Sequence, residues 1–188
     1  MAEMRVNPTR MEQKKLKARL AVARRGHKLM RDKRDELMRQ FLDIVREAAE
    51  LRRNVERALA NSYQSFSAAA AISSPKQMSA ALILPKTVSE LEVSTGNIMG
   101  VEVPYFSYSA GTAKSAEYGL AFTSAELDSA VSELSGVVSD MIRLAQLEKT
   151  SSLLSEQIEK ARRRVNALEH IMSPQLEEAI ASISMKLD

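Results

Sequence analysis

Apolar side chains recur at alternating intervals of three and four residues along the first third of the chain. Fourteen successive positions follow this spacing, eleven of them are apolar, and no proline interrupts the run. The positions are Leu16, Leu20, Ala23, His27, Met30, Arg34, Leu37, Phe41, Ile44, Ala48, Leu51, Val55, Ala58 and Ser62. Such a spacing gathers the apolar residues into one narrow stripe on a helix, and a second helix must cover that stripe, as in a coiled coil.

The ends of this first helix carry recognisable signals. Thr9, followed three residues later by Glu12, predicts a capping box at its start. The pattern continues loosely to Ile72 and stops before Pro75, which disfavours helix in the preceding residue. About 60 residues at 1.5 Å each predict a helix of roughly 90 Å, far too long for a compact globule of this size.

A second run of the same spacing follows Thr123 and Glu126, which predict another capping box. A phase shift near Leu144 and Leu147 resembles a stammer, and Pro174 predicts a kink. The seam positions before the shift are Leu127, Val131, Leu134, Val138 and Met141, and those after it are Ser151, Leu154, Ile158, Ala161, Val165, Leu168 and Met172. Beyond the proline, Leu176, Ile180, Ile183 and Leu187 continue a helical pattern.

Two helices of matched length, joined through some 50 residues, are most simply packed as an antiparallel intramolecular coiled coil. In that arrangement residue i faces approximately residue 195 minus i. Parallel homodimerisation is the alternative. We therefore expect a mainly α fold with an N-terminal long helix within residues 1–72, a foot within 73–122 and a C-terminal long helix within 123–188.

The sequence pattern of the foot differs from that of the two long helices. The stretch "SPKQMSAALILP" predicts a short helix with Pro75 in its first turn. The stretch "LEVSTGNIMGVEVP" predicts a β-hairpin in which "STGN" forms the turn, Gly100 hosts a bulge and Pro104 ends the second strand. We expect this foot at the turning end of the coiled coil.

Composition excludes several classes of function. The chain has no cysteine, which removes disulfides and thiolate metal sites, and none of the common phosphate-loop or hydrolase motifs. No stretch approaches the ~20 apolar residues of a membrane span. We therefore expect a soluble cytoplasmic chain with no catalytic residues, no cofactor and no metal. His27 and His170 fall at a similar height, yet no carboxylate spacing completes a ligand set.

Basic residues are concentrated in two segments. Residues 1–60 carry 17 Lys and Arg against 9 Asp and Glu, whereas residues 126–188 carry 7 against 11. The antiparallel register brings the two basic segments together as a collar: Arg24, Arg25, Lys28, Arg31, Lys33, Arg34, Arg162, Arg163 and Arg164. Phosphate binding, a solvated helix face and contact with acidic protein loops are the three interpretations. Interleaved acidic residues and the lack of aromatic side chains argue against nucleic acid.

Four separated blocks, "VNPTRMEQKKLKARL", "RGHKLMRDKRDELMRQF", "NIMGVEVP" and "EKARRRVNALEHIMSPQLEEAI", resemble the D subunit of the vacuolar/archaeal-type rotary ATPases, the central rotor axle. The blocks occur in the family's order and cover both ends and the hairpin. Members of the family run somewhat past residue 188. A basic coiled-coil nucleic-acid-binding or scaffold protein and the stalk protein of the flagellar export ATPase are the alternative assignments.

The resemblance implies a non-catalytic shaft that transmits torque between a hexamer of nucleotide-binding subunits A and B and the membrane ion-translocating ring. It also implies binding of the F subunit near the foot and of a funnel-shaped subunit that links to the ring, with no direct membrane insertion. The hairpin would influence hydrolysis through Asn97, Ile98, Met99, Gly100, Val101 and Val103. The collar would contact the hexamer.

Overall fold

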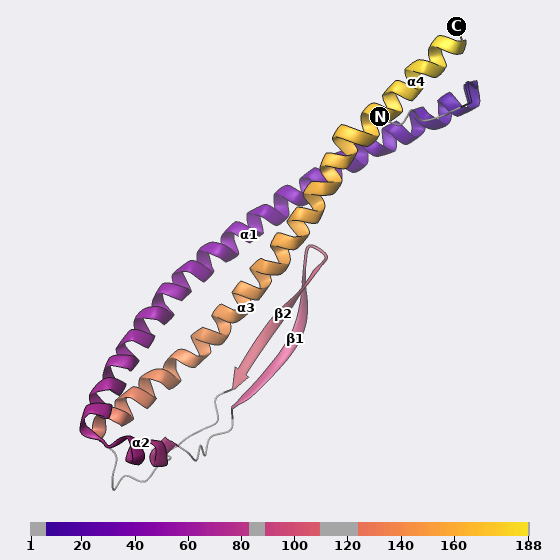
Figure 1. Ribbon diagram of the computed structural model, residues 1–188. Helices are drawn as coiled ribbons and strands as arrows, with labels where there is room; N and C mark the ends of the chain where they lie inside the picture. The colour runs from indigo at the N-terminus through magenta and orange to yellow at the C-terminus, as the bar shows by residue number, and fades with distance from the viewer. Residues whose placement is uncertain (1–6, 83–88, 110–123, 188) are drawn as a thin grey trace. The chain divides into compact units, whose positions relative to one another are not determined.

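The computed structural model describes residues 7–82, 89–109 and 124–187 and is mainly helical, as expected (Figure 1). The elements in chain order are α1 (Arg10–Ile72), α2 (Pro75–Leu82), β1 (Glu90–Ile98), β2 (Val101–Ser109), α3 (Ala125–Ala167), the π-helical segment η2 (Leu168–Met172) and α4 (Ser173–Leu187). The two strands form one antiparallel sheet.

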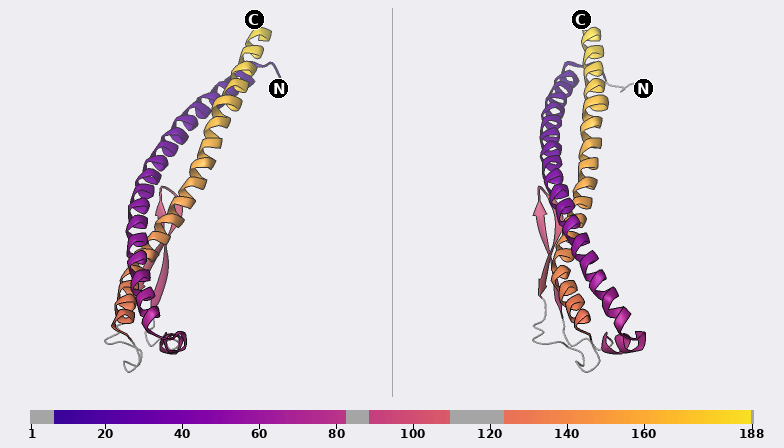
Figure 2. Two further views of the ribbon diagram at one scale, coloured as in Figure 1. Left: turned by 60° about the vertical axis from the view of Figure 1, so that its left-hand side comes forward. Right: turned by 90° about the vertical axis from the view of Figure 1, so that its left-hand side faces the viewer.

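The contacts divide the chain into two compact units. Unit 1 comprises Met1–Phe41 and Leu154–Asp188, and unit 2 comprises Leu42–Leu153. Within each unit, α1 lies beside the C-terminal helices and runs in the opposite direction (Figures 1 and 2). The expected antiparallel two-helix packing within one chain is therefore confirmed, with a small β-hairpin in unit 2.

The start of α1 is capped as the sequence predicts, but only on one side. The hydroxyl of Thr9 accepts a hydrogen bond from the backbone N–H of Glu12 at 3.2 Å. The backbone N–H of Thr9 donates to the carbonyl of Asn7 instead of to Glu12, whose carboxylate pairs with Lys15. For the second long helix, Thr123 lies outside the described residues, and α3 begins at Ala125.

The short helix predicted after Ile72 is α2, and Pro75 is its first residue. Ser74 caps it reciprocally: its hydroxyl accepts from the N–H of Gln77 at 3.3 Å, and its own N–H donates to the side-chain oxygen of Gln77 at 3.1 Å. A complete capping box therefore starts α2, whereas the one predicted for α1 is only half formed.

The apolar stripe of α1 is covered along its whole length. None of its fourteen seam positions is exposed, and Leu16, Ala23, Leu37, Val55 and Ser62 are buried. In unit 1, Leu16 and Ala23 form a core cluster with Leu176 and Ile183 of α4. Burial of apolar area at roughly 25 cal/mol per Å² is the main force that holds such a helix pair together.

The region where we expected a kink contains one turn of π-helix. The N–H of Ser173 donates to the carbonyl of Leu168, five residues earlier, at the junction between η2 and α4. Pro174 follows directly and has no N–H to donate, which weakens the ordinary i to i−4 ladder at this point. The wider π turn accommodates that loss, and it leaves the predicted seam residue Met172 exposed.

In unit 2 the buried face of α3 differs from the predicted seam. Val131 and Leu134 are 36% and 45% exposed and Met141 is also exposed, so all three are wrongly placed in the seam, whereas Ala130 and Val137 are buried. The hydroxyl of Ser62 on α1 donates to the carbonyl of Ala130 at 3.2 Å. Because Ala130 is small, α1 approaches α3 closely at this face, and the larger side chains of the other stripe point outward.

The predicted hairpin exists, but its turn and ends are different. The turn is Met99–Gly100, with φ of 54° and 83°, and Ile98 pairs with Val101. Two successive positive φ values define a tight two-residue turn that matches the twist of the strands. The expected turn at "STGN" is wrong, no bulge interrupts the pairing, and Pro104 lies inside β2 opposite Thr95.

Candidate functional site

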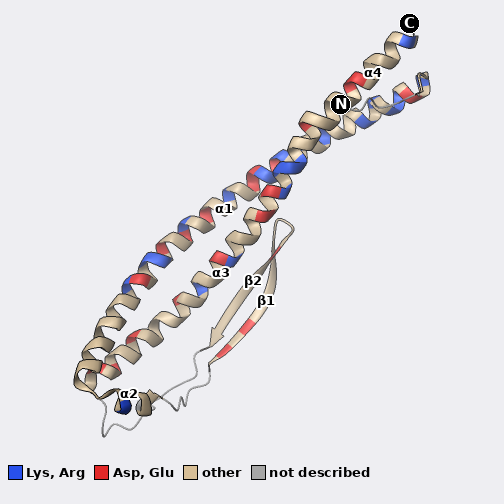
Figure 3. Ribbon diagram, viewed as in Figure 1, with Lys and Arg blue, Asp and Glu red and all other residues tan. Residues whose placement is uncertain are grey.

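The nine collar residues all belong to unit 1. Eight of them are exposed, and Arg34 is partly buried. Figure 3 shows the Lys and Arg residues of α1 and of the adjacent part of α3 in this unit. The pair formed by His27 of α1 and Glu169 of η2 fixes the local register, which brings Arg162–Arg164 level with residues 32–34. The two basic segments therefore lie at the same height, as the sequence predicts.

Three collar residues are already engaged by acidic side chains. Arg24 pairs with Glu177 of α4 at 2.9 Å, Arg34 with Asp35 at 2.6 Å, and Arg163 with Glu159. Among the described residues, the other six form no ion pair: Arg25, Lys28, Arg31, Lys33, Arg162 and Arg164. Their charges are free to interact with a partner.

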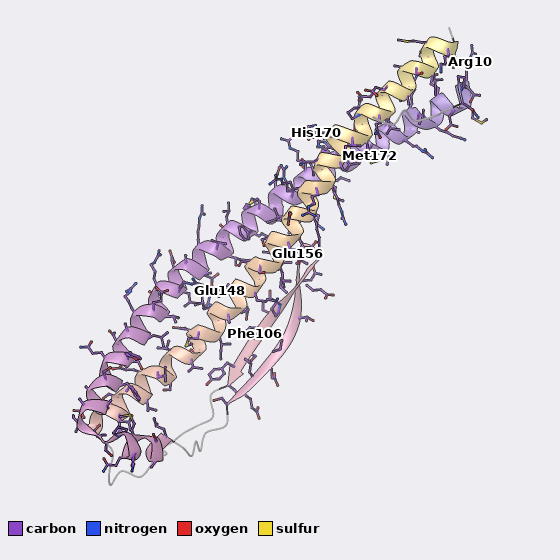
Figure 4. All side chains as sticks on the ribbon, in the orientation of Figure 1. Arg10, Phe106, Glu148, Glu156, His170 and Met172 are labelled. Atoms are coloured by element: carbon purple, nitrogen blue, oxygen red, sulfur yellow. The ribbon has the colours of Figure 1, made fainter. Side chains whose placement is uncertain are left out.

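The two histidines do not meet. His27 Nε2 lies 3.2 Å from the carboxylate of Glu169, and His170 is exposed on η2 (Figure 4). The described part of the chain holds no group of three or more His, Cys, Asp or Glu residues that could bind a metal ion. Nor do its helices include a segment apolar enough to cross a membrane.

The hairpin residues expected to be regulatory surround the turn. The side chain of Asn97 accepts a hydrogen bond from the N–H of Gly100 at 2.7 Å, which holds the turn closed. Val101 and Val103 are buried, whereas Met99 is exposed at the tip. Met99 therefore points outward from the turn, and the hydrogen bond from Gly100 to Asn97, near the end of β1, holds the backbone of the turn in place.

The ring of Tyr105 in β2 covers Gly96 in β1. A Cβ built on Gly96 would lie 2.0 Å from Cε2 of Tyr105, because the aromatic ring covers this glycine. Gly96 pairs with Val103, so Tyr105 reaches diagonally across the ladder. The contact joins Gly96, inside β1, to Tyr105, the residue of β2 that follows Pro104.

Two interhelical ion pairs in unit 2 were not found from the sequence. Arg143 of α3 pairs with Glu47 of α1 at 2.6 Å, and Arg52 of α1 pairs with Glu148 of α3 at 2.5 Å. The polarity is reversed between them, and they flank the seam on opposite sides, as expected of an antiparallel pair. Charge periodicity beside the seam was the available signal, but using it requires the register to within about one turn.

Local hydrogen bonds shift the pKa values of two side chains on the surface of α1, Glu36 and Arg52. Hydrogen bonds from Arg39 and then Gln40 lower the pKa of Glu36 below its ordinary value of 4.5. The hydrogen bond to Glu148 raises the pKa of Arg52 above its ordinary value. Both shifts report ion pairs on helix surfaces.

These features define a class of protein: a helical hairpin whose long helices cover each other's apolar stripes, leave a charged exterior and carry a small β-hairpin. Comparison with known proteins gives the particular family. The family model for the D subunit of ATP synthase matches residues 12–188. The chain therefore belongs to the family of the ATP synthase D subunit, as the four sequence blocks predict, and the flagellar export stalk is set aside.

Bacterial relatives carry the name of the D subunit of V-type ATP synthase. The one from Acetivibrio thermocellus is 56% identical, over 100% of this chain and 86% of its own length. The one from Clostridioides difficile is 50% identical over the same shares, and one from Clostridium botulinum is 46% identical over 99% and 88%. The chain is accordingly a subunit of a V-type ATPase, and hence part of a multisubunit complex.

Proposed function

We propose that the chain is the central rotor shaft of its V-type ATPase and transmits torque between the nucleotide-binding hexamer and the membrane ring. The observation that carries the proposal is α1, which continues without a break from Arg10 to Ile72 and takes part in both units. An unbroken helix with a covered apolar stripe resists bending and local unwinding better than segments joined by loops. A subunit that transmits torque needs this property.

The shaft is itself non-catalytic in this proposal. ATP sites belong to the hexamer of subunits A and B, and the chain supplies no bound cofactor. Its task is to favour a different conformation of the hexamer at each angular position, which requires differential contacts with the alternative states. Polar contacts on a charged surface can be broken and remade at each step.

The collar supplies these contacts with acidic loops of the hexamer. Its support is the set of six cations that have no ion-pair partner in the described part of the chain, together with their exposure. Nucleic acid is the other polyanion that such a patch attracts. Acidic neighbours such as Asp32, Asp35 and Glu36 lie among the basic residues and favour protein over a phosphate backbone.

The remaining partners are proposed from family membership. The F subunit docks on the foot-proximal coiled coil in unit 2, the funnel-shaped subunit links the foot to the ring, and the hairpin tip from Asn97 to Val103 modulates hydrolysis. The exposed side chain of Met99 at the turn supports a contact role for the tip. In this assembly the chain lies on the cytoplasmic side, peripheral to the membrane.

Stoichiometry tests the shaft directly. Native mass spectrometry of the chain mixed with the hexamer and the F subunit of the same organism is expected to show one copy of each small subunit per hexamer. A single central shaft allows no other ratio. Three copies per hexamer, or no association, would overturn the proposal, and a salt-dependent titration with DNA and RNA would then examine the alternative.

The collar is tested by reversing three charges. Replacing Arg162–Arg164 by Glu is expected to weaken coupling, so that hydrolysis continues with less torque in a single-molecule rotation assay. The matched control replaces the same residues by Lys, which retains the charge and should retain coupling. Unchanged torque and turnover in the Glu variant would refute the role of the collar.

A further inference from the structure

The outer edge of β1 is the feature that the proposed function leaves unused. Since Met99–Gly100 is a two-residue turn and Ile98 pairs with Val101, residues at even numbers from 90 to 98 exchange ladder hydrogen bonds with β2. The backbone N–H and C=O groups of the odd-numbered residues Leu91, Val93, Thr95 and Asn97 consequently point away from β2.

The corresponding edge of β2 is protected in its middle. The outward N–H of Phe106 donates to Oε1 of Gln146 on α3 at 2.9 Å. Pro104, at another outward position, has no N–H to leave unpaired. Figures 1 and 2 show the hairpin alongside α3, and Figure 4 labels Phe106 and Glu148 in this region. The helix and the proline therefore protect the middle of the β2 edge, at positions 104 and 106.

The edge of β1 has no comparable protection. In residues 7–82, 89–109 and 124–187, no hydrogen bond engages the outward N–H groups of Leu91, Val93 or Thr95. Leu91 and Val93 are 51% and 62% exposed. The strand is nine residues long and contains no proline, lysine, arginine or bulge, and Glu90 and Glu92 are its charged residues.

Side chains on the two faces of β1 define what would fit. Glu90 and Glu92 lie on one face, and Leu91 and Val93 lie on the other, because successive residues of a strand alternate. An incoming strand is therefore complementary when it presents basic residues beside the carboxylates and apolar residues beside Leu91 and Val93. A second copy of β1 has no basic residue and lacks this complementarity.

We propose that the outer edge of β1 receives an extended segment of a partner protein, with alternating basic and apolar residues, which adds a third strand to the hairpin. Main-chain hydrogen bonds supply the affinity, and the alternating side chains supply the specificity. The proposal concerns the hairpin alone and does not depend on rotation or on the collar.

Hydrogen exchange tests the proposal at single residues. In the free chain, the amides of Glu92 and Ser94 are expected to exchange slowly and those of Leu91, Val93 and Thr95 rapidly. In the assembled V-type ATPase all five are expected to be slow. Rapid exchange of the odd-numbered amides in the assembled complex would overturn the proposal, as would their slow exchange in the free chain. Failure of the chain to assemble would instead count against the proposed function.

A peptide probe separates strand addition from general shielding. A peptide of the same length as β1, alternating Lys and Val, is expected to bind the free chain, whereas a peptide alternating Glu and Val is not. Thr95→Pro removes an outward N–H without removing a ladder bond and should weaken binding by about tenfold. Thr95→Val is the matched control, since it retains the N–H and should bind normally.

Charge reversal supplies the second variant. Glu90→Lys together with Glu92→Lys is expected to reverse the preference, so that the Glu–Val peptide binds and the Lys–Val peptide does not. Slow exchange of the Ser94 amide in each variant establishes that the hairpin is still folded. Equal affinity of Thr95→Pro and Thr95→Val for the Lys–Val peptide, or an unchanged preference after charge reversal, would refute the proposal.

Discussion

Arg52 of α1 and Glu148 of α3 form an ion pair across the seam of unit 2, with a nitrogen–oxygen distance of 2.5 Å. Arg143 and Glu47 form a second pair of opposite polarity. Sliding one helix by one heptad would separate both pairs, so the two together favour a single register. Exposed ion pairs of this kind contribute more to register than to stability.

We therefore expect that the two charges of the Arg52–Glu148 pair can be swapped between the helices. Arg52→Glu alone should lower the melting temperature slightly, because it places like charges together. Adding Glu148→Arg should restore it. A double-mutant cycle by thermal unfolding at low salt measures the coupling, and additive effects of the two substitutions would contradict the interaction.

Two leucines of α3 should respond very differently to truncation. Leu154 is fully buried, so Leu154→Ala is expected to cost about 2–5 kcal/mol in the free energy of unfolding. Leu134 is exposed, and Leu134→Ala should change stability by less than about 0.5 kcal/mol. Urea unfolding measures both. Similar losses would mean that the predicted seam through Leu134 was right after all.

Gly26 lies in the interior of α1 without a steric reason to be glycine. A Cβ built on it meets nothing within 4 Å, and the same holds for Gly136 in α3. Gly26→Ala is expected to stabilise the chain by about 1 kcal/mol, because alanine loses less conformational freedom in a helix. Gly136→Ala is the matched comparison. A loss of stability in both variants would contradict this account.

Gly96 should behave in the opposite way. Gly96→Ala forces the ring of Tyr105 off the strand, and the hairpin is expected to lose about 0.5–1 kcal/mol of local stability. Faster exchange of the Ser94 amide, together with a changed ring environment for Tyr105, would report the effect by NMR. Tyr105→Ala should remove most of the difference between Gly and Ala at this position.

The carboxyl group of Glu36 should titrate below its ordinary value. Its pKa is lowered in the folded chain, so the stabilisation is present above the unfolded value of about 4.5 and is lost as the pH falls through the folded value. An NMR titration of the Glu36 side chain measures the midpoint. Arg39→Gln removes the hydrogen bond that lowers the pKa of Glu36 most, so the midpoint of the titration should rise. An unchanged midpoint would exclude the Arg39 contact.

The sequence specifies α1 better than α3, for a physical reason. The α1 stripe has one uninterrupted frame, so counting heptads from Leu16 identifies positions that are all at least partly covered. In α3, Ala130 and Val137 compete with Val131 and Leu134 for the inward face. Which of these residues face inward depends on how closely α1 approaches α3, and the sequence of one helix alone does not determine that distance.

The hairpin shows a similar limit. Alternation of apolar residues locates both strands, but the turn falls at Met99, a residue that seldom adopts a positive φ. The bond that holds this turn comes from Asn97, two residues before it. The interhelical ion pairs depend on the register of the two helices, and the exposed edge of β1 depends on the register of the two strands. Neither feature can be predicted before these registers are known.

The π turn at Leu168–Met172 changes the heptad frame of the C-terminal helix. A π turn takes up one extra residue, so the frame that begins at Leu154 ends there and a new frame starts one position later. Continuing the old frame would turn Gln175, Ser182 and Lys186 inward, whereas the new one buries Leu176 and Ile183. The segment thus acts as a frameshift of one residue within the coiled coil, and it lets a single helix path use two different apolar stripes in succession.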